Sequence, residues 1–167
     1  MKVVVVSDTH MPKMAKQLPD RLLAELEHTD AIIHAGDWTD SSVFHALRQY
    51  APVYGICGNN DGPGLVRRLG FRRIVQIEKV KVGIVHGHGP GRREETETRA
   101  IRSFASNEVD VIVFGHTHIP LKKTKEGILL FNPGSLTDKR RAGCCTFGIL
   151  KIEGRRLFAE HVVLPSK

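Results

Sequence analysis

The stretch DVIVFGHTHIP, residues 110–120, combines two features that decide how this chain is organised. Its apolar run, Val111–Phe114, predicts a short strand that is buried on both faces. Gly115 then leads to His116 and His118, two imidazoles that are one residue apart. A buried strand explains the apolar run but not the paired histidines. The stretch therefore indicates a strand whose carboxyl end carries a loop with a chemical role.

Four other apolar runs are each followed by a short polar segment, which is called a polar burst below. VVVV precedes SDTH, AIIH precedes AGDWTD, VYGIC precedes GNND, and VGIV precedes HGHG. Open α/β sheets bind their ligands at the carboxyl ends of the strands, so these bursts are expected to meet at one edge. Their side chains are of metal-ligand type: Asp8, His10, Asp37, Asn59, His86, His88, His116 and His118.

The order of the segments predicts an α/β fold. Strands at Lys2–Val6, Ala31–Ile33, Val53–Ile56 and Val111–Phe114 alternate with helical segments at 18–28, 41–50 and 93–106, which favours a largely parallel sheet. A hairpin is expected from Arg72–Ile77 and Val80–Val85. Four further strands follow, at Leu121–Lys125, Ile128–Phe131, Cys145–Ile152 and Leu157–Val163. This all-strand tail predicts a second sheet packed on the first, within one domain of residues 1–167.

Composition narrows the class of protein. Lys and Arg number 25 against 18 Asp and Glu, in short clusters that form either a solvated face or a field that attracts phosphorylated substrates. The low aromatic content, 6%, argues against a surface dedicated to single-stranded nucleic acid. No apolar run is long enough to span a membrane, and the N-terminus does not resemble a signal peptide. Three cysteines without metal-type spacing predict a reduced, cytoplasmic protein.

The chemistry of the bursts predicts metal binding. On an extended chain, residues i and i+2 project to the same side, so Asp8 with His10 and His116 with His118 are each expected to reach one point. Imidazole and carboxylate donors without thiolate suit Mn²⁺, with Fe, Zn²⁺ or Ni²⁺ as alternatives, better than Mg²⁺ or Ca²⁺. Seven donors are too many for one tetrahedral ion, so two divalent ions are expected.

Taken together, the motifs DTH, GDWTD, GNND, HGH, GHTH and NPGS, in this order, resemble the calcineurin-like metallophosphoesterase family, and within it the short bacterial and archaeal phosphodiesterase branch. The resemblance implies a two-sheet αββα sandwich. It also implies a hydrolase in which a metal-bridging hydroxide attacks a small phosphodiester in line. The ligands implied for the first ion are Asp8, His10 and His118; those for the second are Asn59, His86 and His116; and Asp37 bridges both.

One position departs from the family pattern. Many monoesterase relatives have a histidine after the GN pair, where it can protonate the leaving group, but this chain has Asn60. Because asparagine cannot deliver a proton, we expect diesters or good leaving groups to be preferred, unless His88 or water supplies the proton. Asp61 is expected to orient the site through a hydrogen bond or to shape the turn.

Two other functions are compatible with the motifs. The first is a non-catalytic scaffold that resembles the retromer subunit relatives of the family, but no ligand position is lost here. The second is a nucleic-acid phosphoesterase, which the absence of an evident nucleic-acid-binding addition disfavours. A small phosphoester is therefore the expected partner, no membrane partner is expected, and the oligomeric state is left open.

Overall fold

Two five-stranded sheets form the centre of the molecule in the computed structural model, which describes residues 1–166. The first sheet has the order β10-β9-β1-β2-β3, and the second has the order β4-β5-β6-β8-β7. The strands are β1 Lys2–Val6, β2 Ala31–His34, β3 Val53–Gly55, β4 Arg72–Ile77, β5 Val80–Val85, β6 Val111–Val113, β7 Leu121–Lys125, β8 Ile128–Asn132, β9 Thr146–Glu153 and β10 Arg156–Val163. The helices are α1 Asp20–Leu26, α2 Ser41–Arg48, α3 Pro63–Leu69 and α4 Thr96–Arg102, with short 3₁₀ helices η1 Arg93–Glu95 and η2 Arg140–Ala142.

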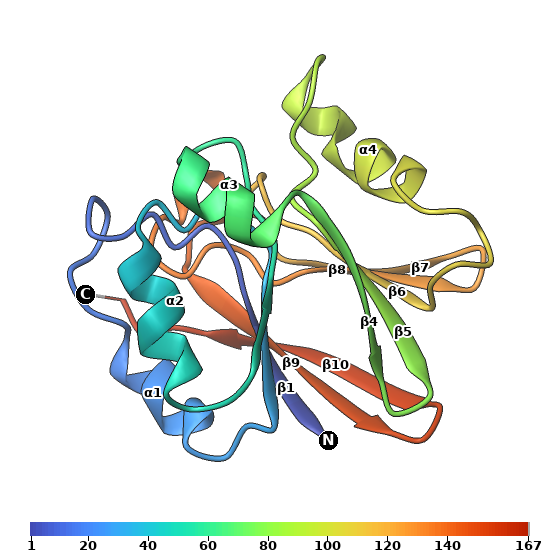
Figure 1. Cartoon of the computed structure of the whole chain (residues 1–167), viewed down its shortest axis with the longest axis horizontal. Coiled ribbons are helices and arrows are strands. Elements are labelled where there is room, and N and C mark those ends of the chain that lie inside the picture. The colour runs from blue at the N-terminus through green and yellow to red at the C-terminus, as the bar shows by residue number, and fades with distance from the viewer. Residues whose placement is uncertain (167) are drawn as a thin grey trace.

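The layers follow from strands that are apolar on both faces. In β1, Val3 and Val5 enter the core between the two sheets, whereas Val4 and Val6 pack under α1 and α2. On the other side, Ile112 of β6 packs with Ala100 of α4. Figure 1 shows α1 and α2 on one side of the molecule and α4 on the opposite side. The predicted αββα sandwich is therefore confirmed.

The assignment of strands to sheets differs from the expectation in two places. The strand after residue 110 was expected to continue the first parallel sheet, but β6 lies in the second sheet between β5 and β8. The tail does not form a sheet of its own. Instead β7 and β8 join the second sheet, whereas β9 pairs antiparallel with β1, in the register Val3 to Leu150. The apolar pattern specifies buried strands without specifying which strand each one pairs with.

Helix positions also differ from those predicted. The predicted segments 18–28 and 93–106 are longer than α1 and α4, and the second begins with η1. Helix α3 was not predicted, although Pro63 at its first turn and Gly70 after its end, at φ 69°, are typical helix boundaries. Within residues 1–166, no helix has the length and apolar content needed to cross a membrane.

The parallel strands bring the polar loops together. Strands β1 and β2 run parallel in the first sheet, and β5 and β6 run parallel in the second. The loops that follow them are hydrogen-bonded to one another: Asp8 N donates to Gly36 O (2.9 Å), and Gly115 N donates to His86 O (3.1 Å). The loops after strands of both sheets therefore meet at one end of the sandwich.

Candidate metal centre

Two groups of buried side chains bring potential ligand atoms close together at this end. The first group consists of Asp8, His10 and His118, and the second of Asp8, Asp37 and His86. In each group, the ligand atoms all lie within 4.8 Å of one another. Five of the seven predicted ligands are thus assembled around two neighbouring points. Asp8 belongs to both groups, whereas the bridging role was assigned to Asp37.

The spacing of the donor atoms suits coordination. His118 Nε2 lies 3.4 Å from Asp8 Oδ1, and His86 Nε2 lies 3.3 Å from Asp37 Oδ2. His10 Nε2 lies 3.5 Å from the same Asp37 oxygen. Donors placed about 2.1 Å from a tetrahedral ion are separated from each other by about 3.4 Å. The donor atoms are therefore spaced as the corners of coordination polyhedra would be.

Unpaired polar atoms provide an independent test of whether metal ions fit. Among the described residues, four buried side-chain N or O atoms have no hydrogen-bond partner: Asp8 Oδ1, His10 Nε2, His86 Nε2 and His88 Nδ1. All four belong to this cluster. A buried polar atom without a partner costs about 1–3 kcal/mol, so four in one place call for a ligand. The oxygen and nitrogen donors fit divalent cations of the first transition row.

Backbone carbonyls orient two of the imidazoles. His86 Nδ1 bonds to Ala35 O (2.7 Å), and His118 Nδ1 bonds to Asp138 O (2.7 Å). Because a carbonyl oxygen only accepts hydrogen bonds, each Nδ1 carries the hydrogen in these contacts. In the neutral ring this leaves the lone pair on Nε2, which faces the carboxylates. Metal-binding histidines are commonly fixed in this way.

Asp8 is held by contacts from three separate segments. Its Oδ2 accepts hydrogen bonds from Ser7 Oγ (2.7 Å) and from His116 N (3.0 Å), which leaves Oδ1 for the cluster. Its carbonyl oxygen accepts a bond from Ser135 Oγ (2.8 Å). Asn132, which also belongs to the NPGS motif, donates to Gly115 O (3.0 Å). The motif therefore ties the loops of the two sheets together.

The backbone geometry of the paired residues is not the expected one. Asp8 and His10 have φ values of 53° and 42°, and His116 and His118 have values of 72° and 64°. These residues are left-handed, so the expectation that each pair projects from an extended chain is wrong. The physical reason is that the chain turns sharply after each strand, and the turn directs His116 N towards Asp8. Both side chains of a pair reach the centre from a turn instead.

The GNND turn supports Asp37. Asn60 donates from its backbone N to Asp37 Oδ1 (2.9 Å) and from its side-chain amide to Asp37 Oδ2 (2.8 Å). The Asp61 carboxylate accepts three backbone N–H bonds, from Asp37 (2.9 Å), Thr39 (2.9 Å) and Gly58 (2.7 Å). Asp61 thus holds the Asp37 loop against the turn, in the orienting position expected for it.

Three predicted site residues lie at the edge of the cluster. Asn59 is exposed in the turn after β3. His116 is half-buried, and its ring meets the His86 ring edge-on with centroids 5.1 Å apart. The His88 ring lies 5.4 Å from that of His86 and 5.7 Å from Phe71, which is exposed. His88 therefore lies next to His86 and close to an exposed aromatic ring.

The pKa values of the clustered side chains show that the two carboxylates favour a bound cation. Burial raises the pKa of Asp8, but His86 and the other histidines hold it well below its usual value. Burial lowers the pKa of His86, but the carboxylates of Asp8 and Asp37 raise it to about 9. By contrast, burial lowers the pKa of His116 to about 4, and the charges of His86 and Arg93 add to this effect. The two carboxylates thus stabilise positive charge where an ion would bind.

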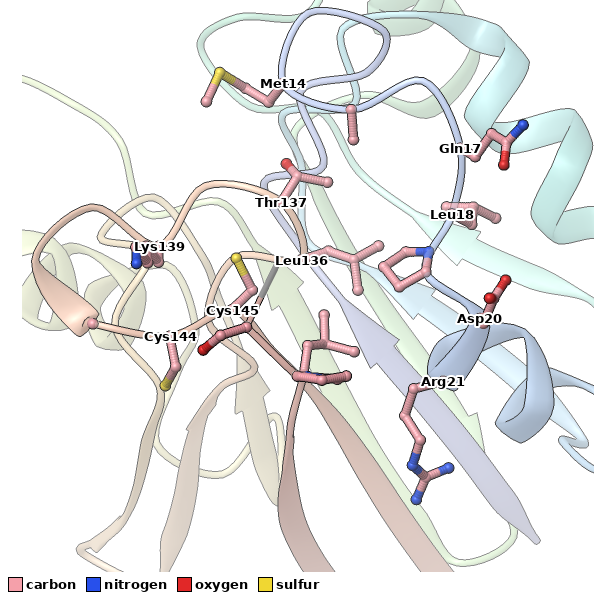
Figure 2. A pocket seen from close by; sticks show the side chains of 16 residues that line it. Met14, Gln17, Leu18, Asp20, Arg21, Leu136, Thr137, Lys139, Cys144 and Cys145 are labelled. Atoms are coloured by element: carbon pink, nitrogen blue, oxygen red, sulfur yellow. The ribbon is translucent and has the colours of Figure 1, made fainter.

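A separate cavity of about 620 Å³ is lined by residues on both sides of Asp138 in the sequence, including Thr137 and Lys139. Figure 2 shows side chains of the segments 14–21 and 136–145 around it. Thr137 lines this cavity and also donates to Thr9 O (2.6 Å), but none of the predicted site residues lines it. The cavity is therefore distinct from the metal centre.

Asp138 and Arg93 are among the residues that contact the centre without having been predicted. Asp138 binds His118 through its carbonyl oxygen, and Arg93 Nη1 donates to His116 O (2.8 Å). A backbone carbonyl has no sequence signal. Arg93 belongs, with Arg92, to one of the short basic clusters of the sequence, and its place after the HGHG burst was the available clue.

Comparisons with known proteins identify the family and the fold of this chain. The model of the calcineurin-like phosphoesterase superfamily domain matches residues 1–155. A probable metallophosphoesterase from Methanothermobacter thermautotrophicus is 33% identical, covering 97% of this chain and 92% of the relative. A solved archaeal phosphodiesterase is 28% identical with a TM-score of 0.73, covering 98% of this chain and 100% of that one. Vps29 of Entamoeba histolytica, solved with zinc, has the same fold, with a TM-score of 0.75, 24% identity, and coverage of 98% and 99%.

Proposed function

This chain belongs to the calcineurin-like phosphoesterase superfamily, and from that premise we propose that it is a dinuclear metal-dependent phosphodiesterase that hydrolyses small phosphodiesters. The observation that carries the proposal is the set of unpaired buried atoms on Asp8, His10, His86 and His88. These atoms point to ligands that the folded chain does not itself provide. The phosphodiesterase similar in structure supports the reaction class.

The residues would divide between two ions. Asp8, His10 and His118 would hold one ion, and Asn59, His86 and His116 would hold the other. Asp37 would contribute to both. When bound, two such ions supply an acidified water and positive charge for the oxygens of an in-line displacement at phosphorus. The protein's own part is to orient the donors: the carbonyls of Ala35 and Asp138 fix His86 and His118, and Asn60 and Asp61 fix Asp37.

Metal loading tests the proposal. Protein reconstituted with Mn²⁺ should contain close to two ions per chain by elemental analysis and should hydrolyse an aryl phosphodiester. Asp37→Ala should lose this activity, because it removes a buried carboxylate from the second group. Full hydrolysis by exhaustively chelated protein would show that the reaction does not depend on metal.

The preference for diesters rests on Asn60. Its amide is directed at Asp37, and asparagine has no proton to give to a leaving group. General acid catalysis is worth about 10²–10⁴-fold, so poor leaving groups should react slowly. The value of kcat/KM should be higher for an aryl diester than for an alkyl monoester. Equal values for the two substrates would contradict this part of the proposal.

We also propose Mn²⁺ as the native metal and a cytoplasmic location. The mixture of carboxylate and imidazole donors supports Mn²⁺, Fe, Zn²⁺ or Ni²⁺. Metal content measured on protein purified without added metal would choose among them. A reduced compartment is supported by the sequence, which has three cysteines without metal-type spacing.

An interaction scaffold is the second candidate. The similarity of this fold to Vps29, at 24% identity, is the observation that favours it. A scaffold has no need of unpaired donor atoms, however, and here they are retained at both groups. Absence of hydrolysis by the fully metal-loaded protein, for every diester and monoester tried, would favour the scaffold.

A further inference from the structure

Two arginines of the segment after β5 contact the loops of the metal centre, and they differ in how their donors are used. Arg99 is half-buried and donates to Gly87 O (2.8 Å), Arg92 O (2.9 Å) and Pro90 O (3.3 Å), and to Thr96 Oγ1 (3.2 Å). Its guanidinium is occupied in holding the loop after His86. Arg99 is therefore a structural residue.

Arg93 is placed differently. It lies in η1, its side chain is exposed, and within residues 1–166 the hydrogen bonding of its guanidinium consists of the contact from Nη1 to His116 O (2.8 Å). It is near enough to His116 for its charge to lower the pKa of that imidazole, after the larger effects of burial and of His86. A guanidinium presents several N–H donors in a planar fork, so most of those of Arg93 are available to a ligand.

The contacts of His116 show where the guanidinium donors of Arg93 lie relative to the metal centre. The His116 backbone donates to Asp8 Oδ2 on one side and accepts from Arg93 on the other. Its ring meets that of His86, whose Nε2 is one of the unpaired donor atoms. Arg93 thus places a permanent positive charge at the rim of the centre, next to a loop held rigidly on Asp8.

We propose that Arg93 is a substrate-binding residue, which donates hydrogen bonds to a phosphoester oxygen at the metal centre. This inference rests on the proposed phosphoesterase function and adds to it a contact made by the protein itself. The ligand class is a phosphoryl oxyanion, because a planar guanidinium matches two oxygens of a phosphoryl group at once. Arg93 also gives the site a fixed cation, whereas neither His88 nor Asn60 carries a permanent charge.

The test compares Arg93→Met with Arg92→Met in protein loaded with Mn²⁺. The two variants lose the same charge from neighbouring exposed positions, but among the described residues the hydrogen bond to His116 O comes from Arg93 and not from Arg92. Affinity for inorganic phosphate is measured by titration calorimetry, metal content by elemental analysis, and kcat and KM with an aryl diester. Arg93→Lys retains the charge and loses the planar fork.

Loss of a hydrogen bond to a charged group predicts about a 10- to 100-fold weaker phosphate affinity for R93M, with metal content unchanged and KM raised. R93K should fall between R93M and the native protein, and R92M should stay within about twofold of native. The proposal would be overturned if R93M bound phosphate with native affinity, if R92M lost as much affinity as R93M, or if R93M lost its metal.

Two further outcomes separate this proposal from the proposed function. If the native protein neither binds phosphate nor hydrolyses the diester, the proposed function fails as well. If the native protein hydrolyses the diester but R93M binds phosphate with unchanged affinity, only the role of Arg93 is removed.

Discussion

At the scale of single residues, the centre depends on backbone conformations that the sequence does not reveal. Asp8, His10, Asp37, His116 and His118 all have positive φ, a region that costs a non-glycine residue of order 1–3 kcal/mol. The residue types and their order after each strand were enough to predict these side chains as neighbours. The turn that each adopts was not predictable, because it is imposed by contacts with distant residues such as Ser135 and Gly36.

Gly115 provides a test of how tightly Asp8 is held. A Cβ at this position would lie 2.0 Å from Ser7 Oγ and 2.6 Å from Asp8 Oδ2, so both side chains would have to move. Gly115→Ala should lower the free energy of unfolding by about 1–3 kcal/mol and weaken metal binding. Urea denaturation and metal titration provide the measurements.

Gly64→Ala is the matched control for this substitution. Gly64 lies in α3, and a Cβ there would have no heavy atom within 4 Å. Alanine in a helix is favoured over glycine by about 0.8–1 kcal/mol, so this variant should be slightly more stable and should bind metal normally. If both variants behaved alike, close packing around Asp8 would not be the cause.

The cysteines should differ in reactivity. Burial raises the pKa of Cys57 to about 12, with smaller contributions from the charges of Asp61 and Asp37, whereas Cys144 and Cys145 are half-buried. Because the thiolate is the reactive form, iodoacetamide at about pH 8 should label Cys57 far more slowly than Cys144 in the native protein. Peptide mass spectrometry measures the labelling, and the rates should converge in urea. Rapid native labelling of Cys57 would contradict its burial.

At the scale of helices and strands, apolar patterns predicted where most strands lie but not how they pair. Val111–Phe114 was identified as a strand, yet its neighbours β5 and β8 are specified by contacts across the whole chain. Helix α3 escaped prediction because it is short and contains Pro63 and Gly64, which usually mark a loop. Asp40, by contrast, is of a residue type that favours the N-cap position, and at the start of α2 it accepts a hydrogen bond from Ser42 N (2.7 Å).

The attachment of α1 to β1 should depend on pH. Glu25 of α1 accepts hydrogen bonds from Lys2 of β1 and from Arg21, and the bond from Lys2 lowers the pKa of Glu25 below its usual 4.5, against the effect of burial. Since the folded pKa is below the unfolded value, the stabilisation is complete above about pH 5 and is lost as the pH falls through the folded pKa.

Glu25→Gln measures this contribution. The difference in unfolding free energy between the native protein and E25Q should be constant between about pH 7 and 5 and should shrink as the pH falls below 4. Glu27→Gln, at an exposed position just after the same helix, controls for the loss of one negative charge. A difference that grows on acidification would show that the sign of the argument is wrong.

At the scale of the whole molecule, the metal centre joins the two sheets. Asp8 and Asp37 follow strands of the first sheet, whereas His86 and His118 follow strands of the second. An ion held by Asp8 and His118 would connect residues far apart in the sequence across the interface between the sheets. Metal binding should therefore stabilise the fold as a whole.

The size of this stabilisation depends on how strongly the folded chain binds the metal. Free Mn²⁺ at a hundred times its dissociation constant should raise the unfolding free energy by about 2.7 kcal/mol for each site, if the unfolded chain does not bind it. Urea denaturation with Mn²⁺ and with chelator measures the difference, and Asp37→Ala should respond much less to Mn²⁺. An equal response in D37A would place the stabilising ion elsewhere.

The pairing of β1 with β9 also has a consequence for synthesis of the chain. Strand β1 lies between β2 and β9, so one of its edges receives its partner only when residues 146–153 have been made. Until then, a nascent chain on the ribosome exposes an unpaired edge that contains four consecutive valines, Val3–Val6. Such an edge readily pairs with other chains. We therefore expect translation that stops before Thr146 to release fragments that aggregate, and the emerging chain to depend on chaperones until its last strands return to the first.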